Sequence, residues 1–278
     1  MSAPSRELPR WVDIGLIPLV NLLAAFLVTG LVFLAIGESP LESVAIMVNG
    51  AFGYGTGLGL FNIGAEGQAY LGGLGVALVC LPLGFLPMVI IIPLAIIGAA
   101  LFGAGWAFIP AYLQAKRGSH VVITTIMFNF IASALMIYLL VNVMSPKGSM
   151  NPETRPFDVN AHLPFIHDVL AGLGITIAKS PLNLSFLWAL ICALAVWLLL
   201  WHTTLGYQLR VLGANPSAAA YAGMKPQRLI IIAMLISGGL SGFLALNEIM
   251  GAQNRLLLEF TAGYGFVGIA VALMGRSH

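Results

Sequence analysis

The sequence predicts an all-helical protein that crosses a membrane many times. Of its 278 residues, 59% are hydrophobic and only 8% are charged, whereas a soluble domain carries roughly 25% charged residues. Residues 14–37 and 67–115 contain no charge at all, and such runs are long enough to cross a bilayer core of roughly 30 Å. Most of the surface is therefore expected to face the lipid bilayer. The net charge of only +2 gives no indication of nucleic-acid binding.

Charged residues and prolines divide the apolar sequence into predicted spans. The run at 67–115 has room for two spans, separated by the turn between Pro82 and Pro87. Residues 43–60 are weakly apolar and rich in glycine, which predicts a partial span. We expect seven or eight membrane-embedded segments in all, and the remaining spans are predicted over residues 14–37, 121–144, 184–201, 229–246 and, short and glycine-rich, 260–274.

Two polar segments are predicted to lie on opposite sides of the membrane. Residues 145–183 hold five prolines and are predicted to form an extracytoplasmic loop with a short surface helix. Residues 203–228 are basic, and since Lys and Arg concentrate on the cytoplasmic side, this loop is predicted to be cytoplasmic. Lys116 agrees with that orientation, but Arg10 does not, because three predicted spans separate the two. Either one segment is re-entrant or a span is absent between residues 38 and 61.

The octapeptide Phe-Asn-Ile-Gly-Ala-Glu-Gly-Gln at residues 61–68 is the most informative motif. It places Asn62, Glu66 and Gln68 beside two glycines at the start of a long apolar run. A carboxylate at membrane depth costs at least ~2.5 kcal/mol, so it is usually paired or faces a cavity. The motif therefore indicates either a broken helix that lines a solute path or a glutamate that caps a helix at the membrane surface. In both cases we expect Glu66 to face the protein interior, close to Asn62 or Gln68.

A second polar group lies within the predicted span at 121–144. Thr125 and Asn129 are four residues apart and share one helix face. They indicate either a polar strip along a solute path or hydrogen bonds between helices, which is the more common use of such residues in membranes.

The basic loop contains the signals of a short helix made of small residues. Asn215 followed by Pro216 is a favourable helix start, and Gly223 provides its end. A helix that presents Ala218, Ala219 and Tyr221 suits docking into a groove of another protein. The alternative is an ordinary amphipathic connector.

Three segments resemble the branched-chain amino acid/sugar/nucleoside permease family of bacterial ABC importers. They are the octapeptide at 61–68, the stretch His-Val-Val-Ile-Thr-Thr-Ile-Met-Phe-Asn at 120–129, and the loop at 213–223. The octapeptide resembles the nucleoside branch, or the simple-sugar branch, of that family. The resemblance extends from Gly50 to His278. Against the family pattern, one span is missing near residues 53–60, where the charge count also fails, and the C-terminal spans are missing, which suggests a fragment or a degenerate copy.

The resemblance implies a membrane-spanning permease subunit of an importer in the bacterial inner membrane. Its solute would be a nucleoside, or alternatively a simple sugar such as ribose or galactose. The loop at 203–228, with Gly213, Pro216 and the small helix, would dock on an ATP-binding subunit. The chain would also pair with a second, related permease and be supplied by an extracytoplasmic solute-binding protein.

Two other classes of function were weighed against a transporter subunit. An intramembrane enzyme needs convergent catalytic groups, yet only Glu66 lies beside an apolar run in suitable surroundings, and no Gly-x-x-x-x-Gly-Lys-Ser/Thr phosphate loop is present. Catalytic residues, metal sites and cofactors are therefore not predicted, and the cysteines Cys80 and Cys192 are interpreted as small apolar residues. A passive channel would fit the glycine-rich spans but leaves the helix of small residues unexplained.

Overall fold

The structure is a computed structural model that describes residues 61–274, except 147, 150, 173, 176 and 177. The predicted span at 14–37, the partial span at 43–60 and the expected deletion near 53–60 lie outside the described residues. Within them the regular secondary structure is helical, apart from two isolated β-bridges. The helices, in chain order, are α3 (Ala65–Leu83), α4 (Met88–Arg117), α5 (Val121–Leu139), α6 (Ile166–Gly172), α7 (Ser185–His202), α8 (Thr204–Ala214), α9 (Pro216–Tyr221), α10 (Pro226–Gly242) and α11 (Tyr264–Met274).

Three shorter helical segments complete this part of the chain. The π-helical segment η2 (Leu140–Met144) continues α5, and η4 (Leu246–Ala252) follows α10. The 3-10 turn η3 (Val159–Ala161) lies in the long loop between α5 and α7.

Five helices of the described part are long and apolar enough to cross a membrane. They agree closely with the predicted spans, and they are Ala65–Leu83, Met88–Arg117, Val121–Met144, Ser185–His202 and Pro226–Ala252.

The predicted span at 260–274 is helical from Tyr264 to Met274, the last described residue, as α11. Its helix begins four residues later than predicted, and whether it spans the membrane stays a prediction. The late start is due to the preceding turn, in which Glu259, Ala262 and Gly263 have φ angles of 58°, 44° and 80°. A right-handed helix cannot include residues in that left-handed conformation.

Helices α3, α4 and α10 form the packed centre of the described bundle, and glycines bring their backbones together. A methyl group added at Gly72 of α3 would overlap the backbone of Gly242 of α10. A methyl group at Gly103 of α4 would likewise overlap the carbonyl of Gly238. In lipid, where apolar burial between helices yields little, this close approach provides the van der Waals contact that holds helices together.

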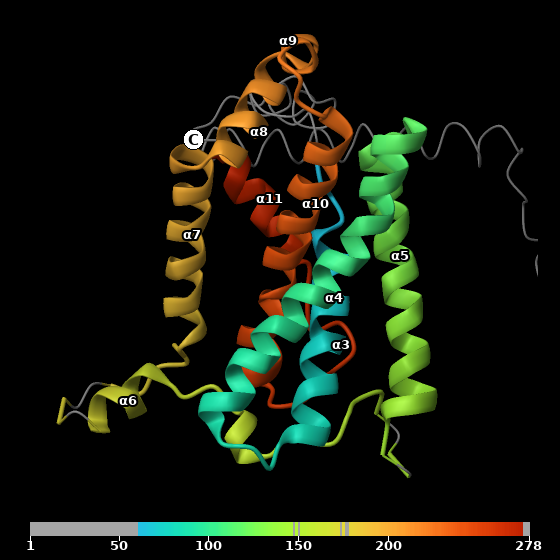
Figure 1. The fold of residues 1–278 in the computed structure, drawn as a ribbon. Coiled ribbons are helices and arrows are strands. Elements are labelled where there is room, and N and C mark those ends of the chain that lie inside the picture. The colour runs from blue at the N-terminus through green and yellow to red at the C-terminus, as the bar shows by residue number, and fades with distance from the viewer. Residues whose placement is uncertain (1–60, 147, 150, 173, 176–177, 275–278) are drawn as a thin grey trace, which may run out of the picture. The chain divides into compact units, whose positions relative to one another are not determined.

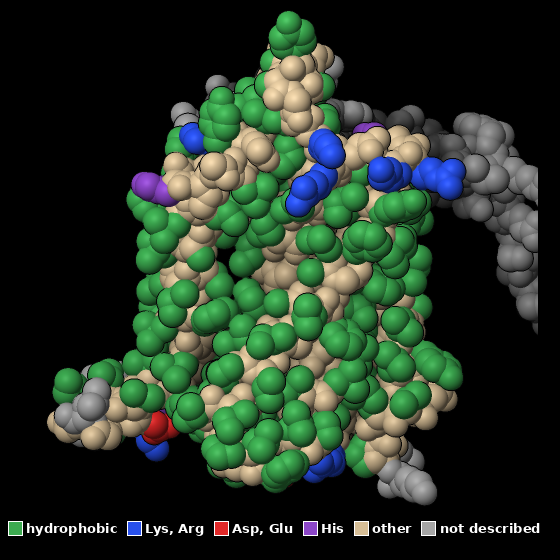
Figure 2. All heavy atoms as spheres, viewed as in Figure 1, with side chains coloured by type: hydrophobic (Ala, Val, Ile, Leu, Met, Phe, Trp, Pro, Cys, Tyr) green, Lys and Arg blue, Asp and Glu red, His purple; other side chains and the backbone are tan. Residues whose placement is uncertain are grey.

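The outer helices present apolar side chains away from this centre. None of the residues of α7 is buried, and Leu190, Leu194 and Trp197 are about half exposed. Figure 2 shows hydrophobic side chains covering the middle of the visible face, with Lys and Arg gathered toward its two ends. This distribution matches a protein whose middle is surrounded by acyl chains.

The two polar segments lie at opposite ends of the bundle (Figure 1). Helices α8 and α9, from the loop at 203–228, lie at the same end as the C-terminus of α4. Elements η3 and α6, from the loop at 145–183, lie at the other end. In the loop at 203–228, the sequence predicted only the short helix that is α9. The structure adds a second helix, α8, which has eleven residues of the same loop.

Candidate functional site

Residues 61–64, which precede α3, are not helical, and side-chain hydrogen bonds hold their backbone in place. The side chains of Asn62 and Gln68 pair reciprocally, with amide nitrogen-to-oxygen distances of 3.0 and 3.1 Å. Asn62 also donates to the hydroxyl of Ser237 on α10 and accepts the backbone N–H of Gly64. Because Gln68 is only 1% exposed, this pair stabilises the start of α3 from inside the protein.

Asn129 of α5 completes the support of the same segment. Its side-chain oxygen accepts the N–H of Gly67 at 2.9 Å, and its nitrogen donates to the carbonyl of Ile63 at 2.8 Å. A methyl group at Gly67 would approach the Asn129 oxygen to 2.9 Å. Thr125, one turn earlier, is fully buried and its hydroxyl donates to the backbone carbonyl of Val121 in its own helix. Thr125 therefore does not contribute a free polar group to a path.

Glu66 binds a distant part of the chain. Its carboxylate accepts hydrogen bonds from the hydroxyl of Thr261 and from the backbone N–H groups of Gly263 and Gly265, the latter two at 2.9 Å. These N–H groups belong to the N-terminal end of α11, where a helix has unpaired donors and a partial positive charge. Glu66 thus fastens the start of α11 to the start of α3, whereas the hydrogen bonds of Asn62 and Gln68 involve other groups.

A cavity of about 400 Å³ opens beside this carboxylate, between α3, α5 and the turn before α11. Its volume falls within the roughly 300–1,000 Å³ typical of small-molecule sites. Polar and aromatic groups from all three segments line it, namely Glu66, Tyr70, Asn129, Phe130, Ser133, Glu259, Thr261 and Phe266.

The turn that forms one wall of the cavity has an uncommon backbone. Glu259 and Ala262 both have positive φ angles, a conformation that costs a non-glycine residue about 1–3 kcal/mol and that concentrates at ligand sites. The side chain of Glu259 is exposed. Glu66 already accepts three hydrogen bonds, so Glu259 is the cavity carboxylate with more capacity to accept from a solute.

The structure brings together only some of the predicted path residues. Glu66 and Asn129 line the cavity, while Asn62, Gln68 and Thr125 do not. The sequence analysis missed the cavity residues Tyr70, Ser133 and Glu259. Each is an unremarkable residue in sequence, and only the folding of the turn at 258–263 against α3 and α5 makes it part of one site.

The second candidate site is α9, which has the predicted start and end. The side chain of Asn215 accepts the N–H groups of Ser217 and Ala218, both at 3.0 Å. Pro216 occupies the first helical position, and Gly223 follows the helix with a φ of 77°. Both ends of the helix are therefore stabilised by residues of its own loop.

The exposed face of α9 differs from the predicted one at one position. Ala219 is fully buried and packs with Leu209, Leu212 and Leu229 in a small apolar cluster. It is unavailable for docking because it anchors α9 onto α8 and α10. Ala218 is exposed, and Tyr221 is 97% exposed, so these two residues remain on the free surface of the helix.

The described geometry defines a class of protein: a polytopic membrane protein with a cavity beside the start of α3 and a surface helix at one end. The chain belongs to the family described as branched-chain amino acid transport system / permease component, which matches residues 44–278. It is thus the non-catalytic, multi-pass membrane subunit of an ABC importer. No solved structure matches the chain.

Curated relatives divide between two kinds of solute at similar identity. A guanosine ABC transporter permease of Bacillus subtilis is 33% identical, over 94% of this chain and 79% of its own length. A nucleoside ABC transporter permease of Lactococcus lactis is 30% identical, over 94% and 78%. A glucose ABC transporter permease of Haloferax volcanii is 31% identical, over 99% and 78%.

Proposed function

We propose that the chain, as a single permease domain over residues 1–278, forms the translocation path for a nucleoside. The observation that carries this proposal is the lining of the cavity beside Glu66. The aromatic rings of Tyr70, Phe130 and Phe266 border the same space as the carboxylate of Glu259. Aromatic faces stack on nucleobases at a gain of about 1–3 kcal/mol per base, and a carboxylate is the usual acceptor for ribose hydroxyl groups.

A simple sugar, such as ribose, galactose or glucose, is the second candidate. The glucose permease of Haloferax volcanii is as similar to this chain as the two permeases for nucleosides. A sugar would use the same carboxylate and the side chains of Asn129 and Ser133, but it would gain less from three aromatic rings. The aromatic content of the cavity therefore favours the nucleoside.

The proposal assigns partners to the two ends of the bundle. The end with α9 carries Lys116, Arg210, Lys225 and Arg228, and this concentration of positive charge supports a cytoplasmic location. There, the exposed Ala218 and Tyr221 would contact an ATP-binding subunit. The loop at 145–183 would then face an extracytoplasmic solute-binding protein, and a second, related permease would complete the membrane part.

Uptake measurements with matched aromatic variants test the choice of solute. The full-length protein is expressed with its partner subunits, and uptake of labelled guanosine, ribose, galactose and glucose is compared. Phe130→Ala removes a ring that lines the cavity, and Phe108→Ala removes an exposed ring on α4 outside it. We expect guanosine uptake to fall about tenfold or more with Phe130→Ala, in line with one lost stacking contact, and to remain normal with Phe108→Ala.

Two results would contradict the proposal. Uptake of a sugar but of no nucleoside would replace the proposed substrate by the second candidate. Equal uptake by Phe130→Ala and by the unaltered protein would show that the cavity beside Glu66 is not part of the path.

A further inference from the structure

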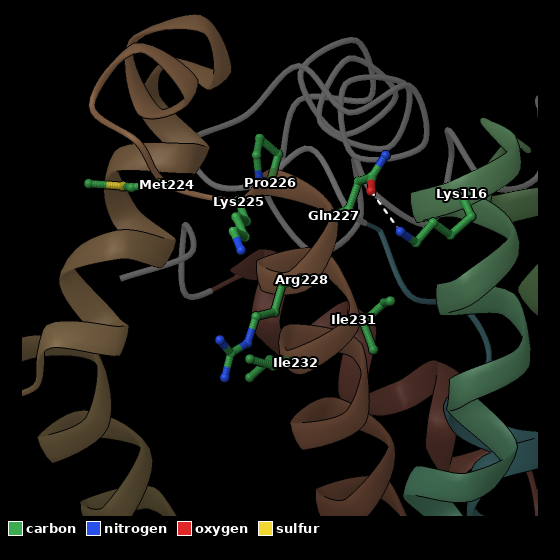
Figure 3. A pocket seen from close by; sticks show the side chains of 8 residues that line it. All are labelled: Lys116, Met224, Lys225, Pro226, Gln227, Arg228, Ile231 and Ile232. Atoms are coloured by element: carbon green, nitrogen blue, oxygen red, sulfur yellow. Dashed lines mark hydrogen bonds between the residues drawn. The ribbon is translucent and has the colours of Figure 1, made fainter.

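A second cavity, of about 460 Å³, lies between the C-terminus of α4 and the N-terminus of α10 (Figure 3). It differs from the cavity beside Glu66 in its charge. Three cationic side chains line it, together with polar and apolar neighbours, and the complete lining is Lys116, Met224, Lys225, Pro226, Gln227, Arg228, Ile231 and Ile232.

One of these cations is held in place by a neighbouring residue. The ammonium group of Lys116 donates to the side-chain oxygen of Gln227 at 3.0 Å, across the gap between α4 and α10 (Figure 3). An ammonium group has three donors, so two remain for another ligand. Lys116, Lys225 and Arg228 are all exposed, and their side chains can rearrange around that ligand.

The counter-charge for this cluster is absent from the surrounding described chain. Residues 67–152 and 169–247, which include α4, α8, α9 and α10, contain no Asp or Glu. The opposite end is different, since Arg255 there forms a 3.1 Å ion pair with Glu153. Within the described residues, the three cations thus lack the kind of partner that Arg255 has.

The remaining lining is apolar and belongs to a membrane span. Ile231 and Ile232 lie one turn into α10, which is part of the span Pro226–Ala252. Figure 3 shows the guanidinium group of Arg228 extending beside Ile232, in the direction of the span. The site therefore combines positive charge at the end of the helix with an apolar surface beneath it.

We propose that this cavity binds an anionic phospholipid, with the phosphate held by the three cations and an acyl chain lying against Ile231 and Ile232. Basic pockets between membrane helices on the cytoplasmic side are suited to such headgroups. A guanidinium group also binds phosphate oxygens in pairs, with specific geometry. Ile231 and Ile232 are half-buried, and Ile231 packs on the cluster of Ala111, Val121 and Met234. Free phosphate would leave their exposed parts uncovered, and an acidic surface of a soluble subunit would place polar groups against them.

Lipid titration of the purified full-length protein tests the proposal. Native mass spectrometry in a neutral detergent measures how tightly phosphatidylglycerol and phosphatidylcholine bind. We expect a clear preference for phosphatidylglycerol. The double variant Lys116→Gln/Arg228→Gln is expected to weaken its binding about 25-fold, at roughly fivefold for each charge removed from the membrane surface.

A double variant of equal net charge is the control. Arg117→Gln/Lys179→Gln also removes two cations, neither of which lines the cavity, and it should bind phosphatidylglycerol like the unaltered protein. Lys225→Glu places an acid in the same cavity and should abolish the preference, which provides a second test should the double variant misfold.

Three outcomes would overturn the proposal. The first is equal binding of the two lipids by the unaltered protein. The second is displacement of phosphatidylglycerol by millimolar inorganic phosphate, which would define a site for free anions. The third is unchanged lipid binding in Lys116→Gln/Arg228→Gln with loss of the ATP-binding subunit, which would assign the cations to that partner.

Discussion

Replacing Glu66 should release the N-terminal end of α11 from the bundle. The carboxylate accepts three hydrogen bonds, from Thr261, Gly263 and Gly265. It joins this turn to α3 together with the edge-to-face contact of Tyr70 with Phe260. Glu66→Leu removes every acceptor at once. Glu66→Gln keeps one acceptor oxygen in a similar position and replaces the other oxygen by an amide N–H donor. Depending on the orientation of the amide, this donor would face the N–H of Gly265 or the donors at Thr261 and Gly263.

The size of the effect follows from the number of donors left unpaired. A buried donor without a partner costs about 1–3 kcal/mol, and Glu66 is half-buried, so water compensates in part. We expect Glu66→Leu to destabilise the closed turn by about 2–4 kcal/mol and Glu66→Gln by about 1–2 kcal/mol. Because 1.4 kcal/mol is a factor of ten in an equilibrium constant, the open population should rise roughly 30- to 1,000-fold and 5- to 30-fold, respectively.

Hydrogen exchange measures this local opening directly. The amides of Gly263 and Gly265 should exchange faster in both variants, with Leu above Gln, while the centre of α4 keeps its protection. Glu259→Gln is the matched control, because it alters a carboxylate of the same turn for which the structure shows no side-chain hydrogen bond to a described residue. Transport should decline in the same order, since the turn forms a wall of the proposed path.

Unchanged exchange at residues 259–266 in both Glu66 variants would refute this reasoning. It would mean that the turn is held by backbone packing alone. Normal transport by both variants would further show that Glu66 is a bystander to function.

Three further substitutions test other parts of the structure. Ala219→Arg should destabilise the loop of α8 and α9 by about 1–3 kcal/mol or more, through overpacking of its apolar cluster, whereas Ala218→Arg should leave the fold intact and block co-purification of the ATP-binding subunit; full association of Ala218→Arg would argue that α9 is only a connector. Gly72→Leu should lower the thermal stability in detergent by several degrees, because its side chain would overlap α10, while Gly105→Leu, with no atom within 4 Å of an added methyl group, should not; equal losses would contradict the proposed close contact. A cysteine at Asn160, in a cysteine-free background, should react with an impermeant reagent from outside the cell; labelling only from the cytoplasm would reverse the orientation.

The membrane spans were predictable because lipid imposes a simple constraint on sequence. Uncharged runs ended by charges, prolines and glycines located four described spans to within a few residues, and the turn between Pro82 and Pro87 separated two of them as expected. The start of the segment at 260–274 was less predictable. Its composition shows that the segment is apolar, but does not show the left-handed turn at 259–263, after which α11 begins at Tyr264.

Helix α8 was predictable from its N-terminal cap and from its leucine spacing. Its polar and basic character indicated a loop, yet Thr203 caps it by accepting the N–H of Gly206 at 3.0 Å. Leu205, Leu209 and Leu212 also follow the spacing of an amphipathic helix. By contrast, the orientation of α9 was not predictable, because six residues with alanine at three successive positions carry no pattern that distinguishes the buried Ala219 from the exposed Ala218.

The candidate site was predictable only in part, through Glu66 and Asn129, and the contacts of Glu66 were not predictable. A carboxylate in apolar sequence indicated a group with a partner, and Glu66 has three. Its partner Thr261 lies 195 residues away in sequence, and two of its three partners are backbone N–H groups, which no side-chain pattern reveals. The pairing of Asn62 with Gln68 was easier to predict, because both residues belong to one octapeptide.

The most direct test of importer function is solute uptake by proteoliposomes that contain the full-length permease with its partner subunits. Uptake of labelled guanosine is measured with ATP on the side of the ATP-binding subunit, with a non-hydrolysable analogue, and without nucleotide. We predict uptake against a concentration gradient only with ATP, and loss of that uptake with Ala218→Arg. Guanosine movement that is equal in all three conditions, and that stops when the gradient is dissipated, would instead establish a passive channel.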